Sequence, residues 1–86
     1  MGRTKDELFV LALYKAVKET GDLESRFNKY EIGERSGLHP KAVNAISRLL
    51  IQANFIRKAG QEDIYLTPHG LKLAEQLLGE KKQSEP

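Results

Sequence analysis

Apolar side chains recur at helical spacing near the start of the chain. Across residues 5–20 they come three and four positions apart, which places them on one broad face of an α-helix. Thr4 suits the N-cap of this helix, and Gly21 suits its C-cap because glycine adopts the left-handed conformation without strain. We therefore expect a helix over 5–20 and a connector over 22–28, from which Phe27 turns into the core.

Two more helices follow, separated by a glycine turn. The second fits residues 29–36 with Asn28 as its N-cap, and Gly37 breaks it by supplying the positive φ that a tight turn needs. The third begins at Pro40, whose missing N–H would be unpaired in the first turn anyway. Asn54 can end this third helix in the left-handed conformation. The pattern predicts two short helices joined by a tight turn.

The third helix has two unlike faces at this spacing. One face is apolar and is expected to pack inward: Val43, Ile46, Leu50 and Ala53, with Leu49 beside them. The opposite face is expected to point outward: Lys41, Asn44, Ala45, Arg48 and Gln52. The outer face therefore contains basic and amide side chains and no acidic one.

The pattern changes after the third helix. Residues 55–58 and 63–66 are rich in β-forming side chains, and a short glycine-containing loop joins them, which predicts a β-hairpin. Thr67 and Pro68 then open a fourth helix as its N-cap and its first helical residue, and Gly79 closes it. The fold class expected from these elements is mostly α with a small β-hairpin.

Length and composition fit one small globular domain. The chain has 86 residues, of which 40% are hydrophobic and 30% are charged, and these are ordinary values for a soluble protein. We expect a single domain over residues 1–79. Residues 80–86 contain no apolar side chain and are expected to form a flexible C-terminal tail.

Several kinds of chemistry are excluded or disfavoured. The absence of Cys rules out disulfides, thiol catalysis and cysteine zinc sites. The two His residues have no carboxylate cluster nearby, so we expect no metal. No nucleophile, base and orienting group come together, so we expect no enzyme. With no apolar run of about 18 residues and no signal peptide, we expect a cytoplasmic protein without a membrane span, a cofactor or a small-molecule ligand.

The order of the elements resembles a winged helix-turn-helix, in which a three-helix core carries a two-stranded wing and a C-terminal helix. Residues 31–50 (EIGERSGLHPKAVNAISRLL) look like the helix-turn-helix core. Phe55-Ile56 is similar to the start of the wing in MarR-like proteins, and residues 65–70 (YLTPHG) are similar to their "LTPKG" joint before the last helix. The resemblance covers residues 31–73 and implies a small transcriptional regulator that binds specific sequences of double-stranded DNA. It places the third helix in the major groove and the wing on the DNA backbone.

Charge is unevenly distributed along the chain. Between Arg35 and Gln61 there is no Asp or Glu, and five basic residues give this window a charge of +5. Because the whole chain carries +2, the remainder sums to −3. The window covers the third helix and the first part of the hairpin, which the resemblance places against DNA. Neutralised phosphates supply most of the non-specific affinity for DNA, so double-stranded DNA is the expected partner.

On the third helix, four outward residues are candidates for DNA contact. Lys41, Asn44 and Arg48 are three and four positions apart, so all three can reach one groove. Asn44 and Arg48 are candidates for base readout, since Asn pairs with adenine and Arg with guanine, whereas Lys41 is expected on a phosphate. Ala45 stands where, by the resemblance, many relatives carry Arg, and its methyl group is a candidate contact for a thymine methyl group.

On the hairpin, Arg57, Lys58 and Gln61 are candidates for contacts with phosphates or the minor groove. Strand side chains alternate between faces, so only one of Arg57 and Lys58 can face the DNA. Lys58 is nearer the tip and is the stronger candidate, and Gln61 lies at the tip itself. The alternative without a binding function is that the polar residues of the helix and the hairpin only form an exposed, hydrated surface.

A second function stays open, in which the same scaffold is a protein-interaction adaptor within a larger complex, without direct DNA readout. Ala45 and the low net charge favour it, and an exposed apolar patch on the third helix would support it. A homodimer would use the first and last helices, although the long extra helices of MarR-like dimers are absent. The candidate dimer contacts are Leu8, Leu11, Leu73 and Leu77. The tyrosines are expected at the edge of the core: Tyr14, Tyr30 and Tyr65.

Overall fold

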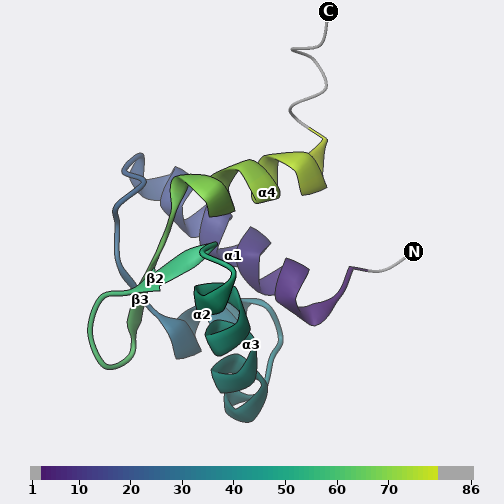
Figure 1. Cartoon of the computed structure of the whole chain (residues 1–86), viewed down its shortest axis with the longest axis vertical. Coiled ribbons are helices and arrows are strands. Elements are labelled where there is room, and N and C mark those ends of the chain that lie inside the picture. Colours follow the sequence, from purple (N-terminus) through teal and green to yellow (C-terminus); the bar gives the residue numbers. More distant parts are fainter. Residues whose placement is uncertain (1–2, 80–86) are drawn as a thin grey trace, which may run out of the picture.

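The computed structural model of the chain describes residues 3–79 and shows four helices and a small sheet (Figure 1). The elements follow in the order α1 (Lys5–Thr20), β1 (Phe27–Asn28), α2 (Lys29–Arg35), α3 (Pro40–Gln52), β2 (Ile56–Lys58), β3 (Asp63–Leu66) and α4 (Pro68–Leu78). The mostly α class is confirmed, and the bounds of all four helices lie within a residue or two of those predicted. The predicted tail over 80–86 lies outside the described residues.

The helix α1 is the centre of the core. Its N-terminus forms a capping box, in which the Thr4 hydroxyl accepts from the Glu7 N–H and the Glu7 carboxylate accepts from the Thr4 N–H. Its C-terminus closes on Gly21 at a φ of 76°. Between these caps α1 packs against α2, α3, α4 and β3. Tyr14, predicted at the edge of the core, is only 3% exposed because α1 is covered by neighbours on several sides.

The helices α2 and α3 pack closely at Gly33. A Cβ atom at this glycine would lie 2.2 Å from Cγ2 of Val43, so the missing side chain lets the two helices approach. The turn between them contains Gly37 at a φ of 75°, and the Ser36 hydroxyl donates to the carbonyl group of Ile32 before it. The predicted pair of short helices with a tight glycine turn is therefore confirmed.

The sheet has three antiparallel strands in the order β1-β3-β2, one more than the sequence predicts. The added strand is β1, within the predicted connector 22–28, where Phe27 pairs with Ile64 and Asn28 with Asp63. The sequence does not predict β1, because a strand of two residues is too short to show an alternating pattern of apolar and polar side chains. Asn28 also caps α2, since its side chain accepts from the Tyr30 N–H at 2.8 Å. The extra strand ties the β2–β3 hairpin to the start of α2.

The base of the hairpin, where β2 begins and β3 ends, is joined to α3 and α4 through Thr67. This residue is 4% exposed, and its hydroxyl donates to the carbonyl oxygens of Asn54 and Phe55, 2.7 Å and 3.0 Å away. The same hydroxyl accepts from the Gly70 N–H at 2.9 Å and so caps α4. One side chain therefore joins the end of α3, the start of β2 and the start of α4.

The prediction for two residues on the inner side of α3 is wrong. Leu49 is 59% exposed and Ala53 is also exposed, whereas Val43, Ile46, Ser47 and Leu50 form the buried stripe. The helix contacts α1, α2 and β2 along one side only, so the buried arc is narrower than the apolar residues of the sequence suggest. The helix therefore presents an apolar side chain to solvent. No described helix has the length and apolar character needed to cross a membrane.

We expect Thr67→Val to lower the free energy of unfolding by about 1–3 kcal/mol, because it leaves the buried Gly70 N–H without its acceptor and removes the hydroxyl donor of the Asn54 and Phe55 carbonyl groups. Thr20→Val is the matched control, because Thr20 is an exposed residue whose hydroxyl bonds only to groups near the end of α1, the Val17 carbonyl group, the Asp22 N–H and the Ser25 hydroxyl among them. The control should change stability by less than about 0.5 kcal/mol. Urea unfolding measures both, and equal effects would contradict the role given to Thr67.

Candidate functional site

A groove of about 370 Å³ lies between α3 and the β2–β3 hairpin. We call it the α3–hairpin groove. The helix α3 lines it with Asn44, Ser47, Arg48, Ile51 and Gln52. The hairpin lines it with Lys58, Gln61, Glu62, Asp63 and Ile64, and α2 adds Lys29. The groove therefore joins side chains from three elements that are far apart in the sequence.

The groove brings together four of the predicted site residues: Asn44, Arg48, Lys58 and Gln61. All four are exposed, so a partner can reach them. Lys58 faces the groove because it alternates with Arg57 along β2 and pairs with Ile64 of β3. The structure thus places the helix candidates and the hairpin-tip candidates on the two walls of one hollow.

The other three predicted residues lie outside the groove. Lys41 is exposed in the first turn of α3, at the end of the helix away from the hairpin. Ala45 is exposed on the same helix and does not line the groove. Arg57 pairs with Tyr65, on the opposite face of the sheet from Lys58. A partner in the groove would contact Arg57 only by also reaching around the edge of the hairpin.

The groove is less basic than the acid-free window of the sequence. It contains three basic residues, Lys29, Arg48 and Lys58, and two acidic ones, Glu62 and Asp63, which gives a net charge of +1. The acids directly follow the window along the chain, and the turn of the hairpin brings them back into the groove. Lys29 has no sequence signal, because only folding places it beside α3.

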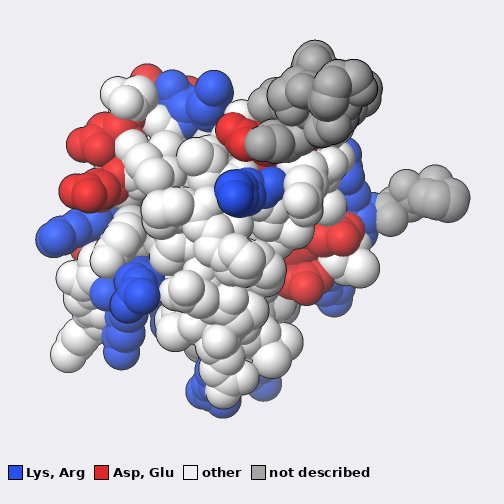
Figure 2. Space-filling model, turned by 45° about the horizontal axis from the view of Figure 1, so that its top comes forward, with Lys and Arg blue, Asp and Glu red and all other residues white. Residues whose placement is uncertain are grey.

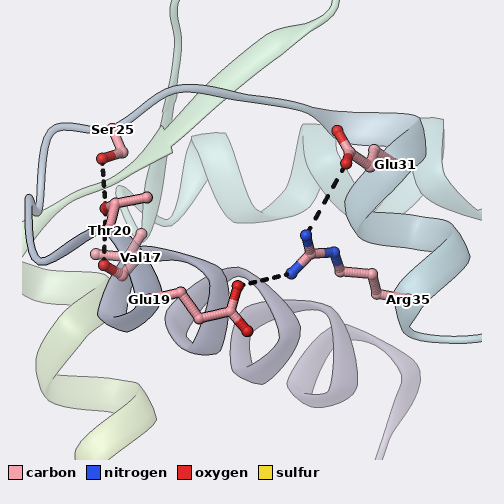
Figure 3. Close-up of polar contacts among 6 residues, drawn as sticks. All are labelled: Val17, Glu19, Thr20, Ser25, Glu31 and Arg35. Atoms are coloured by element: carbon pink, nitrogen blue, oxygen red, sulfur yellow. Dashed lines mark hydrogen bonds and ion pairs between the residues drawn. The ribbon is translucent and has the colours of Figure 1, made fainter.

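Arg35 belongs to the same window of sequence but lies in a different place. Its guanidinium reaches between Glu19 of α1, at 3.7 Å, and Glu31 of its own helix, at 3.9 Å (Figure 3). These acids offset its charge on the side of α2 that faces α1. The basic surface over α3 and the hairpin therefore comes from the remaining basic residues, and Arg35 is a scaffold residue.

Figure 2 shows how charge is arranged on one face of the molecule. Lys and Arg side chains gather at the hairpin side on the left and at the lower end, where α3 begins. No acidic side chain appears on the surface between these two groups in this view, and another basic side chain stands above the middle of the face. Positive charge therefore lies at the hairpin side and at the start of α3, with uncharged surface between the two.

The helix α3 also has an apolar side, which we call the α3 apolar flank and define as Ala45, Leu49 and Ala53. These residues are four positions apart and all are exposed, Leu49 by 59%. At about 100° per residue, the flank lies on the far side of α3 from Asn44 and Ile51. An exposed apolar patch on this helix is what the sequence analysis gave as support for a protein-interaction adaptor.

Asn44 is held at the edge of the groove by a residue of α2. The hydroxyl group of Tyr30 donates to Oδ1 of Asn44 at 2.9 Å. Tyr30 was expected only as an aromatic residue at the core edge, and it is half-buried there. Sequence patterns give no sign of this bond, because the two residues belong to different helices and meet only when these pack.

The leucines proposed for a homodimer are mostly used inside the molecule. Leu11 is 7% exposed, and Leu73 and Leu77 are partly buried against the core. Leu8, at 39% exposed, is the one candidate with a free surface among them. The pairing of α1 with α4 explains this, because the two helices cover each other. A homodimer through these helices stays a prediction that a sizing measurement tests.

No protein-family model matches the chain, and no curated protein is significantly similar to it. Within residues 3–79, no three His, Asp or Glu side chains come close enough together to hold a metal ion. The features of the site that bear on its function are therefore the groove, the outer side of α3 and the hairpin.

The neighbouring leucines of α3 offer a direct test of which side of the helix is free. Leu49→Ala should change the free energy of unfolding by less than about 0.5 kcal/mol, because the side chain is exposed. Leu50→Ala should lower the free energy of unfolding by about 2–5 kcal/mol, because it leaves a cavity where a side chain only 4% exposed was packed. Urea unfolding of the two variants compares them, and a large loss for Leu49→Ala would show that this side is covered.

Proposed function

We propose that the chain is a winged helix-turn-helix that binds double-stranded DNA, with α3 in the major groove and the β2–β3 hairpin as the wing. The observation that supports this most directly is the α3–hairpin groove, where Asn44 and Arg48 stand opposite Lys58 and Gln61. These are side chains that contact bases and phosphates in protein–DNA complexes. Apart from the additional strand β1, the order of helices and strands is compatible with the one that the resemblance implies.

The outer side of α3 suits a DNA major groove in shape and in chemistry. A helix of about 10–12 Å diameter fits a major groove about 12 Å wide. Lys41, Asn44 and Arg48 follow one another along this side, and α3 has no acidic residue to repel phosphates. Asn44 and Arg48 would meet base edges, and Lys41 would meet a phosphate at the start of the helix.

The α3–hairpin groove would receive the sugar–phosphate strand that borders the major groove. Lys58 would neutralise its phosphates from the hairpin wall, and Lys29 would add a second positive charge from α2. Glu62 is turned to the scaffold, since its carboxylate accepts from Nδ2 of Asn28 at 3.2 Å. This bond directs one of the two acids of the groove away from an incoming phosphate.

The second candidate function is a protein-interaction adaptor, and the α3 apolar flank favours it. Leu49 is 59% exposed, and exposed apolar side chains that gather on one face mark interaction surfaces. The flank and the groove lie on different sides of α3, so variants separate the two functions. In the adaptor case Leu49→Glu abolishes copurification of a partner protein, whereas charge reversal at Lys41 and Arg48 leaves it intact.

Salt-dependent binding to random duplex DNA tests the proposal. We expect a Kd of about 1–100 μM, which is typical of non-specific binding. If Lys29, Lys41 and Lys58 each neutralise a phosphate, affinity should fall about 40-fold between about 50 and 200 mM salt. The double variant Lys41→Glu/Arg48→Glu should lose binding. Fluorescence anisotropy of a labelled duplex measures each quantity.

The matched control for this test is Lys15→Glu/Lys72→Glu, which changes the net charge by the same amount. Both lysines are exposed on α1 and α4, away from the groove. This control should keep most of the affinity, because the loss in the first variant is local. Equal losses in the two variants would mean that only total charge matters. An absence of wild-type binding at about 50 mM salt would contradict DNA binding altogether.

A further inference from the structure

The hydrogen bond between Tyr30 and Asn44 connects the two helices at the edge of the α3–hairpin groove. The Tyr30 hydroxyl donates to Oδ1 of Asn44 at 2.9 Å. Asn44 is exposed and lines the groove, whereas Tyr30 is half-buried and packs against the core. A side chain that is free to meet a partner is therefore held by one that belongs to the scaffold.

Tyr30 is itself held in place, so its hydroxyl is a stationary donor. Its N–H donates to Oδ1 of Asn28, which places it in the first turn of α2. Its ring packs against the core, and the ammonium group of Lys29 lies 5.4 Å from the ring centroid. These contacts restrict both the backbone and the ring, and the position of the hydroxyl follows from them.

An amide can meet a tyrosine hydroxyl with either of its two ends, because the hydroxyl both donates and accepts. In this structure the Tyr30 hydroxyl donates to the amide oxygen, which gives the Asn44 amide one orientation. Oδ1 therefore points toward Tyr30, and Nδ2 points away from it. Nδ2 makes no hydrogen bond to any residue in 3–79, so both of its N–H groups are available.

We propose that Tyr30 is a positioning residue that sets the base preference of Asn44, an inference that rests on the proposed DNA binding. An asparagine reads adenine by accepting from its N6 group and donating to N7 with the two ends of one amide. With one of the two lone pairs of Oδ1 engaged by Tyr30 and Nδ2 turned away from it, Asn44 presents chiefly its two N–H donors to a partner. That arrangement matches guanine, whose N7 and O6 both accept. Guanine is therefore the base preferred at this contact, in place of adenine.

Selection from a pool of randomised duplexes tests this preference in the intact chain. The wild type should enrich guanine at the position that Asn44 contacts, and Asn44→Ala should lose the preference at that position alone. Tyr30→Phe frees the amide to turn and should shift the same position toward adenine by about two- to tenfold, the effect of one hydrogen bond. All other positions should stay as in the wild type.

Tyr65→Phe is the matched control, because it removes the hydroxyl of a half-buried tyrosine that lines a separate hollow with Glu24 and Arg26. It should leave every position unchanged. Enrichment of adenine by the wild type, or identical preferences for Tyr30→Phe and the wild type, would overturn the proposal. Weaker preference at all positions in Tyr30→Phe would also overturn it, since that result indicates a merely structural role.

A second measurement does not require DNA. In NMR spectra of the ¹⁵N-labelled chain, the side-chain amide signals of Asn44 should move in Tyr30→Phe and stay in place in Tyr65→Phe. Unmoved signals would overturn the positioning role even if DNA binds. If the amide signals move but the wild type enriches no duplex, the proposed DNA binding fails and the base preference fails with it, while Tyr30 still positions Asn44.

Discussion

The contact between the Phe55 carbonyl group and the first turn of α4 holds the fold together at the base of the hairpin. The Phe55 oxygen accepts from the Thr67 N–H at 3.1 Å and from the Thr67 hydroxyl at 3.0 Å. A Cβ atom at Gly70 would stand 2.1 Å from the same oxygen. The close approach requires a glycine in the first turn of the helix, and the Thr67 hydroxyl caps the helix at the same place. The rings of Phe55 and His69 stack at 4.6 Å beside this contact.

The geometry of the α3–hairpin groove follows from this contact and from a second one at the opposite end of the hairpin. The chain leaves α3 through Asn54 at a φ of 67°, enters β2 and returns to the same place at Thr67. Near the tip, the Lys29 N–H donates to the Glu62 carbonyl group at 2.8 Å. Because both ends of the hairpin are anchored to helices, its distance from α3 is set by the scaffold, and the groove exists before any partner binds.

The parts of the fold that could be predicted depend on neighbours along the chain. The caps at Thr4, Asn28 and Thr67 act within one helical turn, and Pro40 suits the first turn of α3, so short stretches of sequence were enough to place all four helices. The strand β1 could not be predicted, because two residues have no period and their partner lies far along the chain. The exposure of Leu49 was missed for a related reason: the width of a buried helix face depends on which other elements cover it.

For the candidate site, the sequence by itself determined which side chains α3 and the hairpin carry and in what order, including a helix without acidic residues. The tertiary structure decided which of them act together. In the folded chain Arg35 lies beside Glu19 of α1 and Glu31 of α2 and not beside α3. Folding also brings Lys29, Glu62 and Asp63 into the groove. It also placed the Tyr30 hydroxyl on Asn44. Helical spacing and caps are local properties of the chain, whereas the charge and hydrogen bonding around a side chain depend on segments that only folding brings together.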